Sequence, residues 1–161
     1  MIIIRNMLVL LFVFSIMELV AWWTHKYIMH GILWSMHKDH HQKNNTKFFE
    51  KNDWFALIFA LPSIVFIIIG TQTGLEKVYF WIGLGISIYG AVYFLAHDIF
   101  IHRRIKLFKN SENNYLNAIR RAHKIHHKHL TKENGEFFGF LWISNTNREQ
   151  LGSSNSIRTG N

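Results

Sequence analysis

The sequence predicts an all-α integral membrane protein with about three transmembrane spans and a helical cap on one face of the membrane. Three apolar runs predict the spans, because residues 7–23, 54–70 and 78–96 each approach the ~20 residues that cross a ~30 Å hydrocarbon core. The positive charge lies almost wholly on one side of these spans, which predicts their orientation. All 11 histidines fall in residues 25–41 and 97–129, beside span ends, which indicates what the cap carries.

The first apolar run contains one charge, Glu18, and residues 2–4 can lengthen it if the Arg5 side chain reaches the membrane surface. The second and third runs contain no charged residue. A soluble protein can bury a helix that is apolar on all sides, but a chain of 161 residues has too little other sequence to cover three. We expect the first run to be retained, because it lacks a signal-peptide cleavage pattern of small residues.

Loop charge predicts the orientation of the spans. Residues 24–53 carry five Lys and Arg and the chain after residue 97 carries eleven, whereas the opposite side has only Arg5 and Lys77. Because positive loops stay in the cytoplasm, the histidine-rich cap is predicted to be cytoplasmic and the protein to lie in the cytoplasmic (inner) membrane.

The last part of the chain has two predicted features. The apolar stretch 137–143 is a candidate for a fourth, re-entrant membrane segment. The residues after it are polar and rich in Ser, Asn and Gly. We therefore expect residues 1–143 to form a single membrane domain and residues 144–161 to form a poorly ordered tail.

The histidines form a repeated arrangement, in which an HxxxxH pair is followed by an HxxHH triplet. The pairs are His25 with His30 and His97 with His102; the triplets are His37, His40 and His41, and His123, His126 and His127. On an α-helix, positions i, i+3 and i+4 lie within a ~100° arc, so each triplet presents three imidazoles on one face. Positions i and i+5 lie ~140° apart, so a pair can serve one cluster only if its helix ends or bends, or if its members reach different metals.

Ten such histidines exceed the four ligands of one zinc ion and fit two metals. Imidazole suits iron, zinc, copper and nickel, so ligand type leaves the metal open. A loose histidine-rich metal buffer does not explain two ordered sets, and His129 lies outside the pattern. A metal transporter would place polar residues near mid-membrane, where only Glu18 is charged.

Several other chemistries are disfavoured. The chain has no cysteine, which excludes disulfides and thiolate metal sites, and it has no HExxH, ExxH, GxGxxG or Walker A motif. The net charge of +8 is separated from the apolar runs, which favours a membrane, and no nucleic-acid-binding module is recognisable.

Six stretches of the sequence match the pattern of a known protein family. They are AWWTHKYIMHG with the preceding ME (17–31), HKDHH (37–41), NDWFALIFAL (52–61), YGAVYFLAHDIFIHRR (89–104), AHKIHHKH (122–129) and FGFLWI (138–143). In these stretches the chain resembles the bacterial beta-carotene 3-hydroxylases, within the membrane fatty acid hydroxylase superfamily. Two segments depart from that pattern: the one after Arg104 lacks an expected proline, and ENGEFFGF replaces a run of small residues, which puts the fine substrate preference in doubt.

The resemblance implies a monooxygenase that hydroxylates carbon 3 of the beta-ionone rings of beta-carotene, giving beta-cryptoxanthin and zeaxanthin. It implies two iron ions, for which zinc can substitute in a purified sample, with O2 as co-substrate and a ferredoxin-type electron donor. It implies ten ligands: His25, His30, His37, His40, His41, His97, His102, His123, His126 and His127. The target carbon has no acidic proton and no leaving group, which by itself favours oxidative chemistry.

Further site residues are predicted from their positions. Asp39, Asp98, Asn52 and Asp53 are candidates to accept hydrogen bonds from the histidines. Glu18, seven residues before His25 on the same helix face, is a candidate partner near the metals, with helix packing as the alternative. The predicted substrate channel is lined by Trp22, Trp23, Tyr89, Tyr93, Phe94 and Phe138. The basic surface that includes Arg103, Arg104, Arg120, Arg121 and Lys124 could dock an acidic donor or meet anionic lipid headgroups.

Two alternatives remain open at this point. A related di-iron membrane hydroxylase or desaturase could act on a sterol, a sphingolipid or a fatty acyl chain. A carotene ketolase would use the same type of metal centre and give a ketone product.

Overall fold

The computed structural model describes residues 1–42, 49–105 and 111–142. In chain order its elements are α1 (Ile2–Trp23), the π-helix η1 (Thr24–Ile32), α2 (Trp34–His41), the 3₁₀ turn η2 (Lys51–Asp53), α3 (Trp54–Thr73), α4 (Val78–Phe94), the π-helix η3 (Leu95–Ile101) and α5 (Asn114–His126). The described residues contain no strand, so the all-α prediction is confirmed. The predicted tail, residues 144–161, lies outside the described residues.

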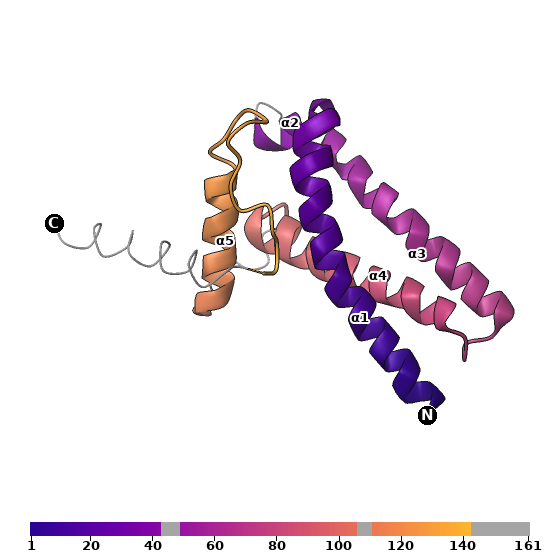
Figure 1. The fold of residues 1–161 in the computed structure, drawn as a ribbon. Helices are drawn as coiled ribbons and strands as arrows, with labels where there is room; N and C mark the ends of the chain where they lie inside the picture. The colour runs from indigo at the N-terminus through magenta and orange to yellow at the C-terminus, as the bar shows by residue number, and fades with distance from the viewer. Residues whose placement is uncertain (43–48, 106–110, 143–161) are drawn as a thin grey trace.

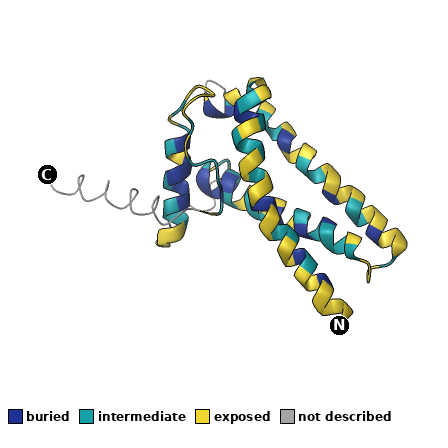
Figure 2. Cartoon of the chain, viewed as in Figure 1, coloured by how far each residue is buried: buried dark blue, intermediate teal, exposed yellow. Residues whose placement is uncertain are grey.

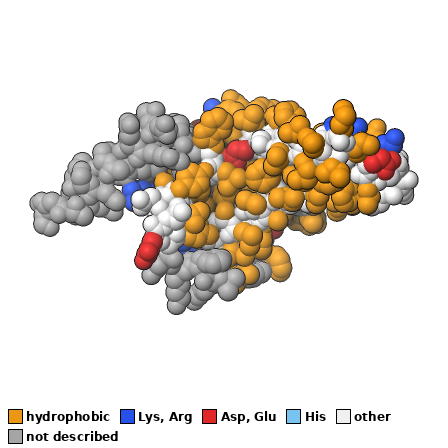
Figure 3. Space-filling model, turned by 90° about the horizontal axis from the view of Figure 1, so that it is seen from below, with side chains coloured by type: hydrophobic (Ala, Val, Ile, Leu, Met, Phe, Trp, Pro, Cys, Tyr) orange, Lys and Arg blue, Asp and Glu red, His pale blue; other side chains and the backbone are white. Residues whose placement is uncertain are grey.

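Three helical segments are long and apolar enough to cross a membrane: Ile2–Ile32, Lys51–Thr73 and Val78–Ile101. Their outward faces are exposed and apolar, as expected for surfaces that meet lipid (Figures 2 and 3). The three predicted spans are therefore confirmed. The described part of the candidate fourth segment, residues 137–142, forms no helix and runs as irregular chain beside α1 and α4.

Helix α4 lies between α1 and α3 and packs against both, while α1 and α3 do not pack against each other (Figure 1). Close packing depends on glycine. A Cβ on Gly83 would lie 2.8 Å from the Ser63 carbonyl oxygen on α3, and one on Gly85 would lie 3.0 Å from the Leu10 carbonyl oxygen on α1. Small residues serve this purpose in membranes, where helix association relies on close van der Waals contact.

The cap is built where the spans end. The π-helices η1 and η3 continue α1 and α4, and α2 follows a break at Gly31, whose backbone is not helical. Helix α5 is capped by Asn113, the residue before it, whose side chain accepts hydrogen bonds from the Tyr115 and Leu116 backbone N–H groups. Its apolar face packs on Phe100, Ile101 and Phe140, so α5 is fixed opposite α2.

Candidate metal centre

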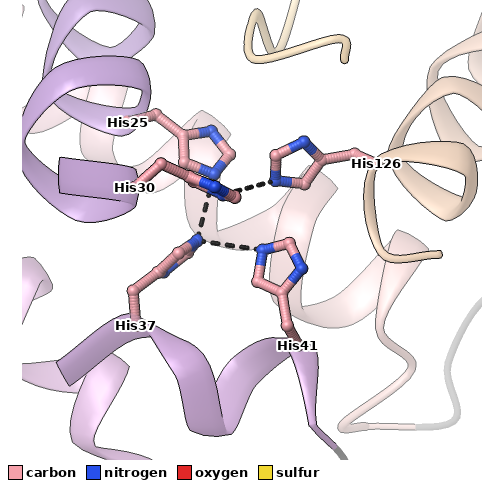
Figure 4. Close-up of side chains that lie close together, drawn as sticks. All are labelled: His25, His30, His37, His41 and His126. Atoms are coloured by element: carbon pink, nitrogen blue, oxygen red, sulfur yellow. Dashed lines mark hydrogen bonds between the residues drawn. The ribbon is translucent and has the colours of Figure 1, made fainter. Parts of the chain in front are cut away.

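The ten predicted histidines converge beneath the cap in two neighbouring clusters. In the first cluster, His25, His30, His37, His41 and His126 offer ring nitrogens that all lie within 4.8 Å of one another (Figure 4). The second cluster has the same property and contains His40, His97, His102 and His123. His127 adjoins the second cluster, with its Nε2 2.8 Å from that of His123. The His129 ring belongs to neither cluster.

The π-helices explain how both members of each HxxxxH pair reach one cluster. The Leu33 N–H donates to the Ile28 carbonyl and the His102 N–H to the His97 carbonyl, five residues back in each case. These hydrogen bonds define π-helical turns, which are often found at functional sites. A π-helical turn brings the side chains at i and i+5 onto the same side of the helix. The ring centroids lie 5.2 Å apart for His25 and His30, and 4.4 Å apart for His97 and His102. The helix was expected to end or bend between the two histidines of each pair. The change from α-helix to π-helix brings them together instead.

Each triplet is shared between the clusters. Positions i and i+4, His37 and His41, join the pair that precedes them in sequence, whereas the i+3 residue His40 joins the second cluster. The second triplet mirrors this exchange, because His126 crosses to the first cluster. On an α-helix, the side chain at i+4 is rotated ~40° in one direction from the side chain at i, and the side chain at i+3 is rotated ~60° in the other direction. A single helix that lies between two clusters can therefore provide ligands to both.

Backbone carbonyls hold most of the first cluster. Four of its Nδ1 atoms donate to carbonyl oxygens in the segment after α5: His41 to His129 (2.8 Å), His30 to Lys132 (3.3 Å), His126 to Glu136 (2.7 Å) and His25 to Phe138 (3.1 Å). The His37 Nδ1 donates to the Asn52 side-chain oxygen at 2.6 Å, as predicted for Asn52. Because every partner is an acceptor, each Nδ1 carries hydrogen and each Nε2 lone pair faces the cluster.

Carboxylates hold two rings of the second cluster. The His40 Nδ1 lies 2.6 Å from the Glu50 carboxylate, and the His97 Nδ1 lies 3.2 Å from Asp98, a predicted partner. Glu50 was not identified from the sequence as a partner of a histidine. The one indication in the sequence was its position two residues before Asn52, which was identified as such a partner. Asp53 instead pairs with Arg104 and accepts the Glu50 backbone N–H, and no contact with a histidine is found for it among the described residues. Asp39 instead accepts the Lys51 N–H.

Glu18 has a different set of partners from the predicted one. One carboxylate oxygen accepts three consecutive backbone N–H groups, from Phe140 (2.7 Å), Leu141 (2.7 Å) and Trp142 (3.1 Å). The other accepts the Tyr89 hydroxyl at 2.8 Å. Glu18 thus fixes the irregular chain at residues 140–142, and it is linked to His25 through the Phe138 carbonyl of the same stretch.

A cavity of about 350 Å³ lies between α1, α3 and α4 and ends at the histidines. His25, His97 and His123 form its end wall, and its sides are mainly apolar. Four predicted channel residues line it: Tyr89, Tyr93, Phe94 and Phe138. Trp22 and Trp23 are not among the residues that line it; their rings pack against Tyr27, and Trp22 also lies next to Gly139, so their predicted place in the channel stays a prediction.

Burial lowers the pKa of six cap histidines and keeps them neutral at pH 7. Desolvation lowers the pKa of His41 to about 4, of His126 to about 3 and of His37 to about 2, with neighbouring imidazoles adding to the effect. The same causes lower the pKa values of His40, His123 and His127. Neutral imidazoles that share one small volume are the form that binds a metal ion.

These pKa values predict acid sensitivity of the protein prepared without metal. As the pH falls below 6.5, the ordinary histidine value, the unfolded chain protonates these side chains while the folded chain does not. The unfolded state then binds more protons, so the free energy of unfolding decreases as the pH falls from about 7 toward 4. We expect a clearly lower melting temperature in detergent at pH 5 than at pH 7. Equal melting temperatures would contradict the burial of neutral histidines.

Comparison with known proteins gives one consistent result. The family model described as fatty acid hydroxylase matches residues 10–144. A beta-carotene hydroxylase of Pantoea ananas is 40% identical over 126 residues, covering 78% of this chain and 70% of that protein. One from Pseudescherichia vulneris is 38% identical, covering 86% and 77%. A chloroplastic beta-carotene 3-hydroxylase of Arabidopsis thaliana is 34% identical, covering 88% and 45%. No solved structure matches the chain.

Proposed function

The chain belongs to the fatty acid hydroxylase family, and we propose that it hydroxylates carbon 3 of the beta-ionone rings of beta-carotene, giving beta-cryptoxanthin and then zeaxanthin. The observation that carries this proposal is the apolar cavity that ends at two histidine clusters. A hydrocarbon substrate needs an apolar route to the reacting centre, and the bundle offers one from its lipid-facing side. The names of the bacterial and plant relatives support the same substrate.

We propose that the ten histidines hold two iron ions, five at each cluster with His127 as the fifth residue of the second. The donor set fits, because neutral imidazole suits iron and each cluster gathers its Nε2 atoms around one small volume. Bound iron with O2 would supply the oxidising power that an unactivated C–H bond requires. A purified sample that contains zinc would be consistent with the same ligands.

The role of the protein around this centre is to orient the substrate and to exclude water. Phe138, Gly139 and Phe140 form the wall next to the histidines, and Tyr93 stacks on the His97 ring at 4.9 Å. A cavity of about 350 Å³ is in the range for a drug-sized ligand, so it takes one ring and part of the polyene. The exposed residues Ala56, Gly90 and Phe94 on its margin let the rest extend into lipid.

We further propose that the cap faces the cytoplasm from the inner membrane and receives electrons from a ferredoxin-type donor. The exposed cations Arg103, Lys124 and Lys128 support this, since an acidic donor would be attracted to them. If docking is electrostatic, turnover with a protein donor should fall as the ionic strength rises. Turnover that is independent of salt would favour a role in membrane orientation alone.

The deciding experiment is expression in bacteria that accumulate beta-carotene, under aerobic conditions, followed by pigment analysis. We expect beta-cryptoxanthin and zeaxanthin. Neither pigment would be found if the enzyme acted on a sterol, a sphingolipid or a fatty acyl chain, and a ketone product would identify a ketolase. A variant lacking the cluster histidines is the matched control and should leave beta-carotene unchanged.

Filling the cavity should block the substrate without disturbing the metal centre. Gly90 lines the cavity, and a Cβ there meets nothing within 4 Å, so Gly90→Leu should fold and occupy the substrate path. We expect carotenoid conversion to fall about tenfold or more, because the added side chain would occupy volume that the substrate needs; a tenfold change corresponds to about 1.4 kcal/mol. The control is Ala91→Leu, on the lipid face of the same helix. Equal activity of both variants would place the substrate elsewhere.

A further inference from the structure

We propose that Arg104 is a positioning residue that holds the second histidine cluster through two carboxylates and makes the two clusters unequal in metal affinity. This inference rests on the proposed metal centre but does not depend on the identity of the substrate. It concerns the part of the molecule where η3, η2 and the chain before η2 meet.

The guanidinium of Arg104 joins three carboxylates that come from separate parts of the chain. Its nitrogens lie 3.0 Å from Glu50, 2.7 Å from Asp53 and 3.1 Å from Asp98. All four side chains are largely shielded, with side-chain exposures between 13% and 27%, so their attraction is weakly screened by water. One cation thereby keeps three mutually repelling anions in place.

Two of these carboxylates act directly on the second cluster. Glu50 accepts the His40 Nδ1 hydrogen, and Asp98 accepts that of His97. His40 and His97 in turn direct their Nε2 atoms to within 3.2 Å of each other. Arg104 is therefore connected to two rings of the same cluster, in each case through one carboxylate. The two histidines, His40 and His97, lie 57 positions apart in sequence.

The first cluster has no such support among the contacts found in residues 1–42, 49–105 and 111–142. Its five Nδ1 atoms face four backbone carbonyls and the Asn52 amide oxygen, all of them neutral acceptors. A carboxylate draws the imidazole hydrogen more strongly than a carbonyl does and so makes the other ring nitrogen a better donor to a metal. The second cluster should accordingly bind a divalent metal more tightly than the first.

Loss of Arg104 should affect one cluster and not the other. Without the guanidinium, Glu50, Asp53 and Asp98 repel one another, and two of the rings of the second cluster lose their orientation. Outer partners of metal ligands contribute about 10–100-fold in affinity. We therefore expect Arg104→Gln to weaken one of two metal sites by that factor and to reverse the order of their affinities.

The test is anaerobic titration of the full-length, detergent-purified, metal-stripped protein with Co²⁺, followed by visible absorption and by metal analysis after dialysis. Wild type should bind two Co²⁺ in two resolved steps, and Arg104→Gln should lose the tighter step. Arg103→Gln, which removes an exposed neighbouring charge, should bind Co²⁺ in the same two steps as wild type. Glu50→Gln, which keeps an acceptor but removes the charge, should also weaken the tighter step and decides the matter if Arg104→Gln does not fold.

Two results would overturn the proposal. Titrations of Arg104→Gln or Glu50→Gln that match wild type would show that the carboxylates do not tune affinity, and equal weakening of both steps would show only a general structural role. Wild-type protein that binds no Co²⁺ would instead refute the metal centre itself. Failure to convert beta-carotene, with the tighter step still lost in Arg104→Gln, would refute the proposed substrate and leave this inference standing.

Discussion

Replacing His40 with alanine is expected to remove metal from the second cluster, although His40 lies in the first group of histidines in the sequence. Its ring faces His97 and His102, with ring centroids 5.0 and 4.3 Å away. An outer partner of a ligand contributes about 10–100-fold, so loss of the ligand itself should lower activity at least about a hundredfold. Metal content should fall from about two ions per chain toward one.

Double variants can establish which cluster has lost its metal. His40→Ala combined with His97→Ala damages a single cluster and should still retain about one metal. His40→Ala combined with His25→Ala damages both and should retain none. The control His129→Ala keeps the backbone carbonyl that holds His41 and should leave metal content unchanged. If the pairings gave the opposite result, His40 would belong with its sequence neighbours and the exchange between clusters would be wrong.

Replacing Glu18 with alanine is expected to release the segment that closes the cavity. Three backbone N–H groups and the Tyr89 hydroxyl would lose their acceptor; the Phe140 N–H and the Tyr89 hydroxyl are buried, and the other two hydrogen bonds are partly buried. Each buried donor left without a partner costs about 1–3 kcal/mol. We expect a much lower melting temperature and more than a tenfold loss of hydroxylation, because Phe138 and Phe140 line the cavity and the Phe138 carbonyl holds His25.

Milder replacements separate this role from general stability. Glu18→Gln keeps one acceptor oxygen for the three N–H groups and should retain much of the stability. Tyr89→Phe removes only the hydroxyl contact and should have a smaller effect than Glu18→Ala. A loosened wall should raise the KM for the carotenoid and spread hydroxylation over neighbouring ring carbons. Unchanged products, metal content and activity in Glu18→Ala would remove this role from Glu18.

Much of the membrane architecture could be predicted from local sequence. Apolar runs of the required length predicted three spans, and the structure has helices of that kind at those places. The grouping of histidines beside span ends predicted one metal-binding face. These inferences succeed because span length and side-chain type are properties of a local stretch, and the hydrocarbon core imposes them directly.

Contacts were missed where a residue's partner is distant in sequence. Trp22 was predicted to line the channel, but its neighbour Gly139, 117 positions away, is the residue of that pair that lines the cavity. Asp53 lies beside Asn52, yet it meets Arg104, which is 51 positions away, instead of a histidine. Glu18 was recognised as an unusual charge, but three of its four hydrogen-bond partners are backbone N–H groups more than 120 positions away, and sequence motifs do not reveal backbone partners.

The sequence by itself determined the helical membrane class, the number of spans and the set of ten histidines that approach one another. Only the tertiary structure decided how those histidines divide into two clusters, which acceptors hold each ring, and that π-helical winding brings each pair together. The physical reason is the range of the interactions. Hydrophobicity and helical period act within one segment, whereas a shared cluster depends on the distance and rotation between helices that only packing fixes.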